Sequence, residues 1–132
     1  MRKLRVYVDN SVFGGAYDEE FSEDTRRFFE GVRRGRYTVL ISDVLLKEIA
    51  DAPQRVQEVL TGLPTEAIEE IPLTEDVSEL AEAYIRAGVV GVRWRDDATQ
   101  IAAATVFGAS LLLSWNFKHI VNFEKVQRFN SV

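Results

Sequence analysis

Three short apolar runs, set far apart along the chain, constrain the fold more than any other feature of the sequence. They are LRVYV at 4–8, YTVLI at 37–41 and SLLLS at 110–114. The stretches between them are long enough for helices, and no two-residue hairpin turn joins one run to the next. Strands that are connected through helices form parallel sheets. The sequence therefore predicts an α/β fold in which helices cover both faces of a mostly parallel central sheet.

The intervening segments carry helical periodicity, most clearly at 76–87. Apolar residues recur there at positions i, i+3, i+4, i+7 and i+8, from Val77 to Ile85, which marks one buried face of a helix. Further helices are expected at 23–32, 42–52, 53–60 and 97–107. There is no internal repeat or low-complexity linker, so the sequence predicts a single domain over residues 1–132.

Local signals refine the ends of these elements. Ser22 is expected to cap the first helix, and Ser42 or Asp43 the second, because short polar side chains accept hydrogen bonds from the first free N–H groups of a helix. The glycine pair at 14–15 predicts a turn or a flexible loop, and 67–73 reads as a short strand or a connector.

Composition narrows the chemistry and the compartment. No segment is apolar for long enough to span a bilayer, and the N-terminus does not read as a secretory signal, so a cytoplasmic protein without a membrane partner is expected. The chain has no cysteine and one histidine, His119, which excludes thiolate nucleophiles, sulfur-based zinc sites and multi-histidine metal cages. A bound metal would need oxygen ligands, which favours Mg²⁺ or Mn²⁺.

Charge is distributed unevenly along the chain. The net charge of −5 argues against a general nucleic-acid binder. Between Arg55 and Arg86 there is no lysine or arginine, and the acidic tract there reads as a solvated face or as a surface for a partner chain. The five arginines within 26–36 either form i,i+4 pairs on a helix surface or track a nucleic-acid backbone.

Acidic side chains recur where the predicted strands end. Asp9 directly follows the first strand, and ligands of parallel sheets gather outside the carboxyl ends of the strands. Asp9 alone is equally explained as a turn residue that bonds its own backbone. Glu48 lies three residues after Leu45, on or beside the buried stripe of its helix, where a carboxylate needs a partner. A salt bridge is the alternative explanation for Glu48.

Two adjacent aspartates open the apolar helix at 97–107. Asp96 is in line with Gln100 on the more polar side and suits the N-cap. Asp97 is in line with Ile101 on the apolar stripe and is expected to point inward. Capping explains one of these acids and leaves the second for a shared site.

Ser114 and Asn116 follow the last strand and reach the same edge, unless they only form a turn or cap the segment FKHI. Carboxylates that converge repel one another and raise each other's pKa unless a cation lies among them. A hard divalent ion solves this problem and can activate water at a phosphate. The predicted site therefore combines Asp9, Glu48 and Asp97 as metal ligands with Ser114 and Asn116 beside them.

Four segments carry a resemblance to a known family: VYVDNSVFGG (6–15), SDVLLKEIA (42–50), RDDATQIAAA (95–104) and LLLSWNFKHI (111–120). In this order and at this spacing they resemble PIN-domain ribonucleases, and within them the VapC-like toxins of bacterial and archaeal toxin–antitoxin pairs. The resemblance covers nearly the whole chain. It implies a three-layer α/β/α domain that hydrolyses RNA phosphodiester bonds with Mg²⁺ or Mn²⁺.

The same resemblance assigns roles residue by residue. Asp9, Glu48 and Asp97 match the family's metal-binding acids, and Ser114 matches its small hydroxyl residue. Asn116 stands where a fourth acid is frequent; its amide can still bind a metal or water but brings no negative charge. The resemblance also implies an RNA substrate, an antitoxin partner and a homodimer.

Other readings remain open at this level. Because of Asn116, a degenerate PIN fold that binds RNA or a protein without cleavage is the main alternative. A dehalogenase-like phosphatase would need an acid where Ser11 stands. A receiver domain would need a lysine after a late strand, for which Lys118 is a poor match, and a Ser114–His119 hydrolase would need a nucleophile-elbow glycine pattern that this sequence lacks. Lys118 and His119 are candidates for phosphate contact, and Trp115 either stacks an RNA base or packs against the sheet edge.

Overall fold

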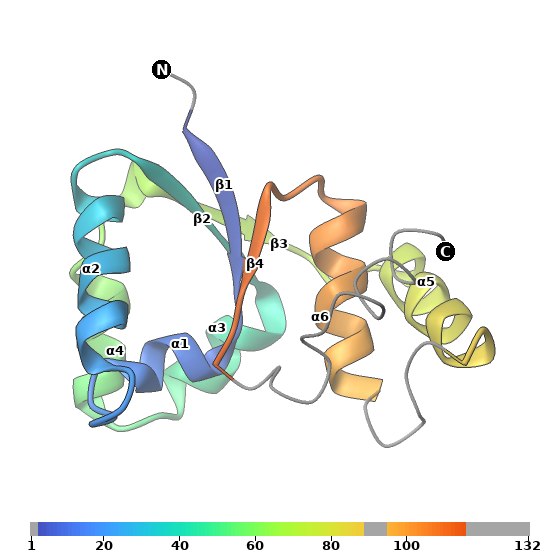
Figure 1. Cartoon of the computed structure of the whole chain (residues 1–132), viewed down its shortest axis with the longest axis horizontal. Coiled ribbons are helices and arrows are strands. Elements are labelled where there is room, and N and C mark those ends of the chain that lie inside the picture. Colours follow the sequence, from blue (N-terminus) through green and yellow to red (C-terminus); the bar gives the residue numbers. More distant parts are fainter. Residues whose placement is uncertain (1–2, 89–94, 116–132) are drawn as a thin grey trace.

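The computed structural model describes residues 3–88 and 95–115, which form four strands and six α-helices with one short 3₁₀ helix (Figure 1). The strands are β1 (Leu4–Val8), β2 (Tyr37–Ser42), β3 (Ile68–Ile71) and β4 (Leu111–Leu113). The helices are α1 (Asn10–Gly15), α2 (Ser22–Arg33), α3 (Asp43–Ala50), α4 (Gln54–Thr61), η1 (Thr65–Ala67), α5 (Glu75–Arg86) and α6 (Arg95–Val106). Within these described ranges, no helix has the length and apolar character needed to cross a membrane.

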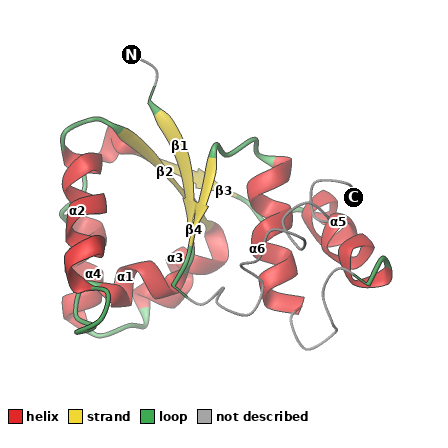
Figure 2. Cartoon of the chain, in the orientation of Figure 1, coloured by secondary structure: helices red, strands yellow, loops and turns green. Residues whose placement is uncertain are grey.

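The sheet has the order β3-β2-β1-β4, and every pair of neighbouring strands is parallel. Val6 of β1 lies between Val39 of β2 and Leu111 of β4, so the first strand is central. Helices lie on both sides of the sheet (Figure 2), which confirms the predicted α/β architecture. The doubtful segment 67–73 contains a strand, β3, at one edge.

The two faces of the sheet are covered by different helices. Val6 and Val8 pack with the group formed by α1, α2, α3 and α4, whereas Tyr7 packs with α5 and α6. This split follows from the two-residue period of a strand, which sends neighbouring side chains to opposite faces. Arg5, Tyr7 and Asp9 are therefore in phase on one side of the first strand.

The glycine pair at 14–15 does not form the predicted turn, because residues 10–15 make a short helix, α1. Asp9 caps this helix by accepting a hydrogen bond from the Ser11 backbone N–H at 3.0 Å. A Cβ on Gly15 would lie 2.5 Å from Nε1 of Trp115 and 2.7 Å from Oγ1 of Thr25. Glycine is needed at position 15 because Trp115 and Thr25 pack closely against α1, and not because the chain reverses direction there.

Two helix starts also differ from prediction. Helix α6 begins at Arg95, so Asp96 is its second residue and not its N-cap. Helix α2 begins at Ser22, with Phe21 in the cap position and no side-chain hydrogen bond there. Ser42 is confirmed as the cap of α3, since its Oγ accepts from the Leu45 N–H at 3.0 Å.

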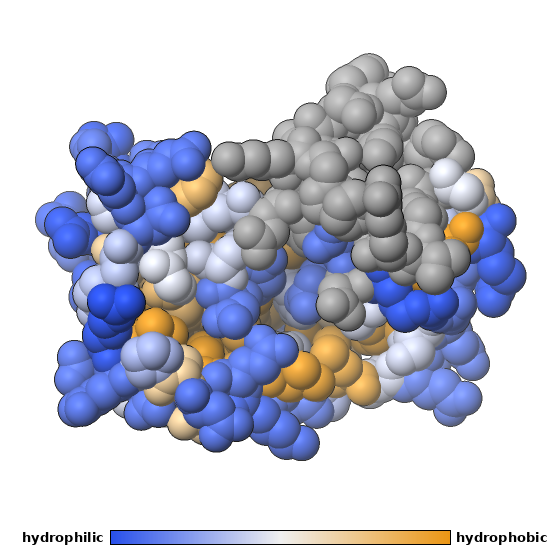
Figure 3. Space-filling model, turned by 90° about the horizontal axis from the view of Figure 1, so that it is seen from below, coloured by the Kyte–Doolittle hydropathy of each residue, from blue (hydrophilic) through white to orange (hydrophobic). Residues whose placement is uncertain are grey.

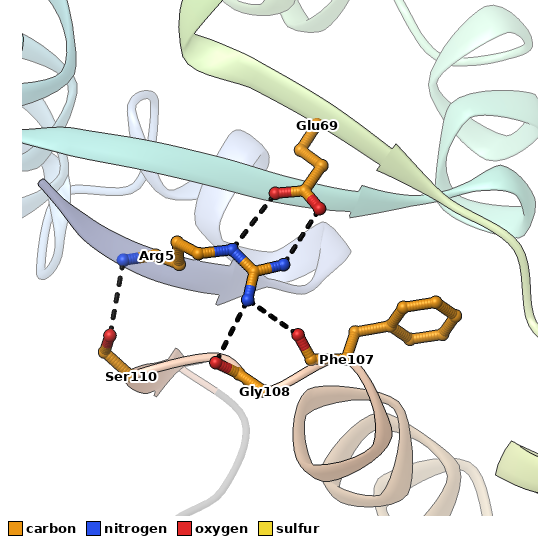
Figure 4. Close-up of polar contacts among 5 residues, drawn as sticks. All are labelled: Arg5, Glu69, Phe107, Gly108 and Ser110. Atoms are coloured by element: carbon orange, nitrogen blue, oxygen red, sulfur yellow. Dashed lines mark hydrogen bonds and ion pairs between the residues drawn. The ribbon is translucent and has the colours of Figure 1, made fainter.

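Arg5 joins three elements at the amino edge of the sheet (Figure 4). Its guanidinium makes a two-point contact with Glu69 of β3, with N–O distances of 3.1 and 2.8 Å. It also donates to the carbonyl oxygens of Phe107 and Gly108, at 2.7 and 3.1 Å, where α6 has just ended. Carbonyls at a helix end have no partner within the helix, so Arg5 satisfies groups that the fold would otherwise leave to water.

Candidate functional site

A small polar pocket lies at the carboxyl edge of the sheet, where β1 and β2 end. Its volume is about 270 Å³, and it is lined by Asp9, Asn10, Ser11, Ser42, Val44, Leu45, Glu48, Asp97 and Gln100. Figure 3 looks onto the molecule from the side to which the strands point, and shows hydrophilic residues around a middle region where apolar residues reach the surface. The three predicted metal ligands thus meet in one cavity, although they come from three separate elements.

Asp9 is the most enclosed of the three acids, at 8 % exposed. Both carboxylate oxygens accept hydrogen bonds: Oδ1 from the hydroxyl of Ser11 and Oδ2 from that of Ser114, each at 2.5 Å. Oδ1 also accepts from the Ser11 backbone N–H. These three donors hold the carboxylate in one orientation while it serves as the cap of α1.

Ser114 enters this arrangement from the last strand. It directly follows β4, whose residue Leu113 pairs with Val8 of β1, so the sheet register brings Ser114 beside Asp9. The backbone N–H of Trp115 donates to Oγ of Ser11 at 2.9 Å and ties the two strand ends together. The structure therefore places Ser114 against Asp9, behind the lining of the pocket.

Glu48 and Asp97 approach from two helices on opposite sides of the strand ends. Glu48 lies on α3 beside the buried residues Leu45 and Ile49, and its own side chain is exposed. It borders the pocket next to Leu45 without being desolvated, and no buried salt bridge is needed to explain it. Asp97 is the third residue of α6 and is half-buried, which agrees with an inward-pointing position.

The pocket gathers negative charge without a basic residue among the described residues that line it. Its acidic side chains end in carboxylate oxygens, which are the metal ligands that Mg²⁺ and Mn²⁺ prefer. In the described part of the chain, however, no three acidic or histidine side chains lie close enough to form a ready-made metal cluster. The described residues therefore supply the ligand type that Mg²⁺ prefers, but not a complete metal site.

Sequence reasoning missed three polar residues of this site. Ser11 bonds Asp9, Ser42 lines the wall beside α3, and Gln100 lines the wall formed by α6. Gln100 was paired with Asp96 on the polar side of the helix, but it stands three residues after Asp97 and shares its cavity. The sequence offered one signal for Gln100: it is three residues from Asp97, a spacing that places two side chains on the same face of a helix.

Other candidates have different outcomes. Asn116, Lys118 and His119 lie outside the described residues. Trp115 stacks on Phe21, with ring centroids 5.1 Å apart and planes 1° from parallel, and donates from Nε1 to Oγ1 of Thr25 at 3.1 Å. One face of the Trp115 indole is therefore already occupied, which favours packing over stacking with an RNA base.

A larger groove of about 1110 Å³ lies between α2 and the strands β1 and β4. Apolar side chains of the strands and five arginines from 26–36 line it, together with Asp24 and Glu30. Arg27 pairs with Glu23 at 2.8 Å, and Arg34 with Glu30 at 3.0 Å, as the i,i+4 spacing predicted. This groove is larger than the carboxylate pocket but does not include Asp9, Glu48 or Asp97.

Comparisons with known proteins bear on the fold. No family model matches the chain, and no curated protein matches its sequence significantly. The structure of the Mycobacterium tuberculosis toxin VapC20, described as cleaving the Sarcin-Ricin loop, matches with a TM-score of 0.61 and 14% identity, over 86% of this chain and 91% of that one.

A second match is VapBC2 from Rickettsia felis, whose structure contains a DNA fragment from the promoter of its genes. The TM-score is 0.58 and the identity 17%, over 89% of this chain and 94% of that one. At these identities the likeness is one of fold. The chain has the PIN-like fold of VapC toxins, which confirms the predicted fold class and the structural side of the resemblance.

Proposed function

We propose that the chain is a metal-dependent endoribonuclease of the toxin type. The observation that carries the proposal is the meeting of Asp9, Glu48 and Asp97 in one cavity whose described lining contains no basic residue. Like charges that share a pocket favour the binding of a cation, which supports a site for a divalent ion. The VapC fold and the toxin VapC20 support ribonuclease activity as the chemistry of this site.

In this proposal Asp9 and Asp97 hold Mg²⁺ or Mn²⁺, and Glu48 binds it directly or through water. The chemistry that such an ion supplies at a phosphodiester is charge neutralisation and activation of water for in-line attack. Ser11 and Ser114 hold the Asp9 carboxylate in one orientation, because both donate to its oxygens. Asn116 is proposed as a neutral member of the same site.

The exposed position of Glu48 has a chemical consequence. A carboxylate on the open side of the pocket can accept a proton from an incoming water, whereas the enclosed Asp9 has its oxygens engaged by hydroxyl groups. We therefore assign Glu48 the positioning of the nucleophile and Asp9 the anchoring of the ion. Cleavage by this route leaves 5′-phosphate and 3′-hydroxyl ends.

Partners follow from the same proposal. The Rickettsia felis complex supports an antitoxin that silences this chain, and RNA is the proposed substrate. We propose a homodimer in the cytoplasm as the working form. Co-expression with the product of an adjacent small reading frame, followed by size-exclusion chromatography with light scattering, tests both associations.

The direct test incubates the purified chain with total tRNA and with ribosomal RNA in Mn²⁺ or Mg²⁺. We expect cleavage that EDTA abolishes and that excess Mn²⁺ restores, with 5′-phosphate ends on the products. Cleavage that persists in EDTA would contradict a metal-dependent mechanism.

The alternative of a PIN fold without catalysis is favoured by one observation. The described carboxylates share the pocket but do not form a ready-made metal cluster. Calorimetric titration with Mn²⁺ separates the two functions: the nuclease predicts a binding signal, and the non-catalytic fold predicts none while circular dichroism shows a folded chain.

A further inference from the structure

The carboxylate pocket has few groups that can bind the substrate. A phosphodiester offers oxygen acceptors, so a site that recognises it must supply hydrogen-bond donors. Among the described residues that line the pocket, side-chain N–H donors come only from the amides of Asn10 and Gln100. Asn10 is exposed, whereas Gln100 is half-buried against the wall formed by α6.

The hydroxyl groups of the pocket are already engaged. Ser11 donates to Oδ1 of Asp9, and it accepts from the Trp115 N–H at 2.9 Å. Oγ of Ser42 accepts from the Leu45 N–H at 3.0 Å as the cap of α3, and its hydroxyl also hydrogen-bonds Tyr7. Neither serine is as well placed as an amide to donate to an incoming phosphate.

Tyr7 determines which end of the Gln100 amide faces the pocket. The Tyr7 hydroxyl donates to Oε1 of Gln100, and the tyrosine is fully buried beneath α6. A tyrosine phenol is protonated at neutral pH and therefore remains a donor to Oε1 of Gln100. A donor at that position selects the amide oxygen and leaves the Nε2 hydrogens on the other end.

We propose that Gln100 is a substrate-contacting residue, whose Nε2 donates a hydrogen bond to a phosphate oxygen of RNA bound in the carboxylate pocket. This inference rests on the proposed ribonuclease function and adds a binding residue to it. An amide suits the position because it carries no charge. A lysine or arginine there would pair with the acids and compete with the metal ion for them.

Replacing Gln100 with glutamate is the informative substitution. The carboxylate keeps the size and the acceptor that Tyr7 needs, but it lacks the N–H donors. We expect KM for RNA to rise about tenfold, with a smaller change in kcat and a small fall in melting temperature from the added negative charge. Gln54→Glu is the matched control, because Gln54 is exposed on α4 and outside the pocket; its KM should stay at the wild-type value.

Two further variants separate hydrogen bonding from charge and from packing. Gln100→Met removes the donors without adding a charge, and it should raise KM as well. Tyr7→Phe releases the amide to rotate, so it should raise KM by a smaller factor and have no further effect in the Gln100→Glu background. If Gln100 only satisfied the buried phenol, Gln100→Glu would leave KM unchanged and Tyr7→Phe would act independently of it.

The outcomes distinguish this inference from the proposed function. A wild-type chain that cleaves RNA while Gln100→Glu and Gln100→Met keep its KM would overturn the role of Gln100 and leave the nuclease standing. A rise in KM for Gln100→Glu alone would assign the effect to charge and also overturn it. A wild-type chain that cleaves no RNA in Mn²⁺ overturns both.

Discussion

Arg5 and Asp9 lie in phase on one side of the same strand, yet their charges have opposite surroundings. At the amino edge, the Arg5 guanidinium meets a carboxylate and two carbonyl oxygens, all within 3.1 Å (Figure 4). At the carboxyl edge, Asp9 shares a pocket with Glu48 and Asp97 and with no basic residue among its described lining. The first end brings opposite charges into contact, whereas the described lining of the second carries negative charge only.

This difference separates a structural cluster from a candidate site better than size does. The arginine-lined groove beside α2 has about four times the volume of the carboxylate pocket, about 1110 Å³ against 270 Å³. Three of the five arginines of that groove, Arg27, Arg33 and Arg34, form ion pairs with Glu23 or Glu30. The charges in the described lining of the carboxylate pocket are all negative, which favours a cationic ligand there.

The largest expected effect concerns the acid that α6 contributes to the pocket. Asp97→Asn should reduce RNA cleavage more than about 100-fold, since losing even an indirect partner of a metal ligand commonly costs 10- to 100-fold. The melting temperature should stay close to that of the wild type, because the amide keeps the size and shape of the carboxylate. Initial rates on a fluorescent RNA, in saturating Mn²⁺, measure the effect.

Asp76→Asn is the matched control for this variant, because Asp76 is an exposed aspartate in the first turn of the neighbouring helix α5. It should cleave at the wild-type rate. Full activity of Asp97→Asn would show that this carboxylate takes no part in the mechanism. The contrast between the amino edge and the carboxyl edge of the sheet would then lose its main support.

Arg5→Met should show the opposite profile, with a loss of stability and no change in chemistry. The variant leaves Glu69 and the carbonyls of Phe107 and Gly108 without their donor. Hydrogen bonds of a charged group and a half-exposed ion pair together predict a loss of about 2 kcal/mol in the free energy of unfolding. Urea denaturation measures it, and the rate of cleavage per folded molecule should stay constant.

Arg26→Met controls for the loss of a surface charge, since Arg26 is exposed on α2 and should change stability by less than about 0.5 kcal/mol. Equal stability of Arg5→Met and Arg26→Met would mean that the amino-edge cluster does not hold the fold together.

The burial of Tyr7, between the two ends of the first strand, predicts that the folded chain loses stability at alkaline pH. Its pKa is raised to about 12 in the folded chain by burial, and an unfolded tyrosine titrates near 10. The unfolded chain therefore releases this proton first, so stability that is fully present below pH 10 falls between pH 10 and 12. The loss from this group is on the order of 2 kcal/mol.

Urea midpoints at pH 9 and 11.5 measure this dependence, which Tyr7→Phe should reduce. Tyr17→Phe, at a tyrosine that is 49% exposed, should leave the slope unchanged. Identical slopes in the wild type and Tyr7→Phe would show that Tyr7 does not stay protonated by burial.

The smallest effect is expected from Ser114→Ala, which removes the hydroxyl that donates to Oδ2 of Asp9. The carboxylate keeps its contacts with Ser11, so cleavage should fall about tenfold and the fold should persist. Ser78→Ala, at an exposed serine of α5, is the control. A wild-type rate in Ser114→Ala would mean that this hydrogen bond contributes only to structure.

Much of the fold was predictable because its signals are local. The apolar runs predicted β1, β2 and β4, and the periodicity at 76–87 predicted α5 within a residue at each end. The glycines at 14–15 were misread because a glycine can serve a turn or a close contact, and only the neighbouring Trp115 and Thr25 decide between them.

The candidate site was predictable in part. The acids were identified because the carboxyl ends of parallel strands meet at one edge of the sheet. Their surroundings were not, since the hydrogen bond from Ser114 to Asp9 spans 105 positions and that from Tyr7 to Gln100 spans 93. The exposure of Glu48 likewise depends on what covers α3, which the helix's own periodicity does not contain.

The sequence by itself determined the order of strands and helices along the chain, and it placed Asp9 directly after the first apolar run and Ser114 at the end of the last one. Only the tertiary structure decided which polar groups accompany the acids: Ser11 and Ser114 against Asp9, and Gln100 turned by Tyr7. The physical reason is the separation along the chain of the residues that determine each feature. Strand and helix formation depends on neighbours within a few residues, whereas the orientation of a carboxylate or an amide depends on groups that folding brings from the far end of the chain.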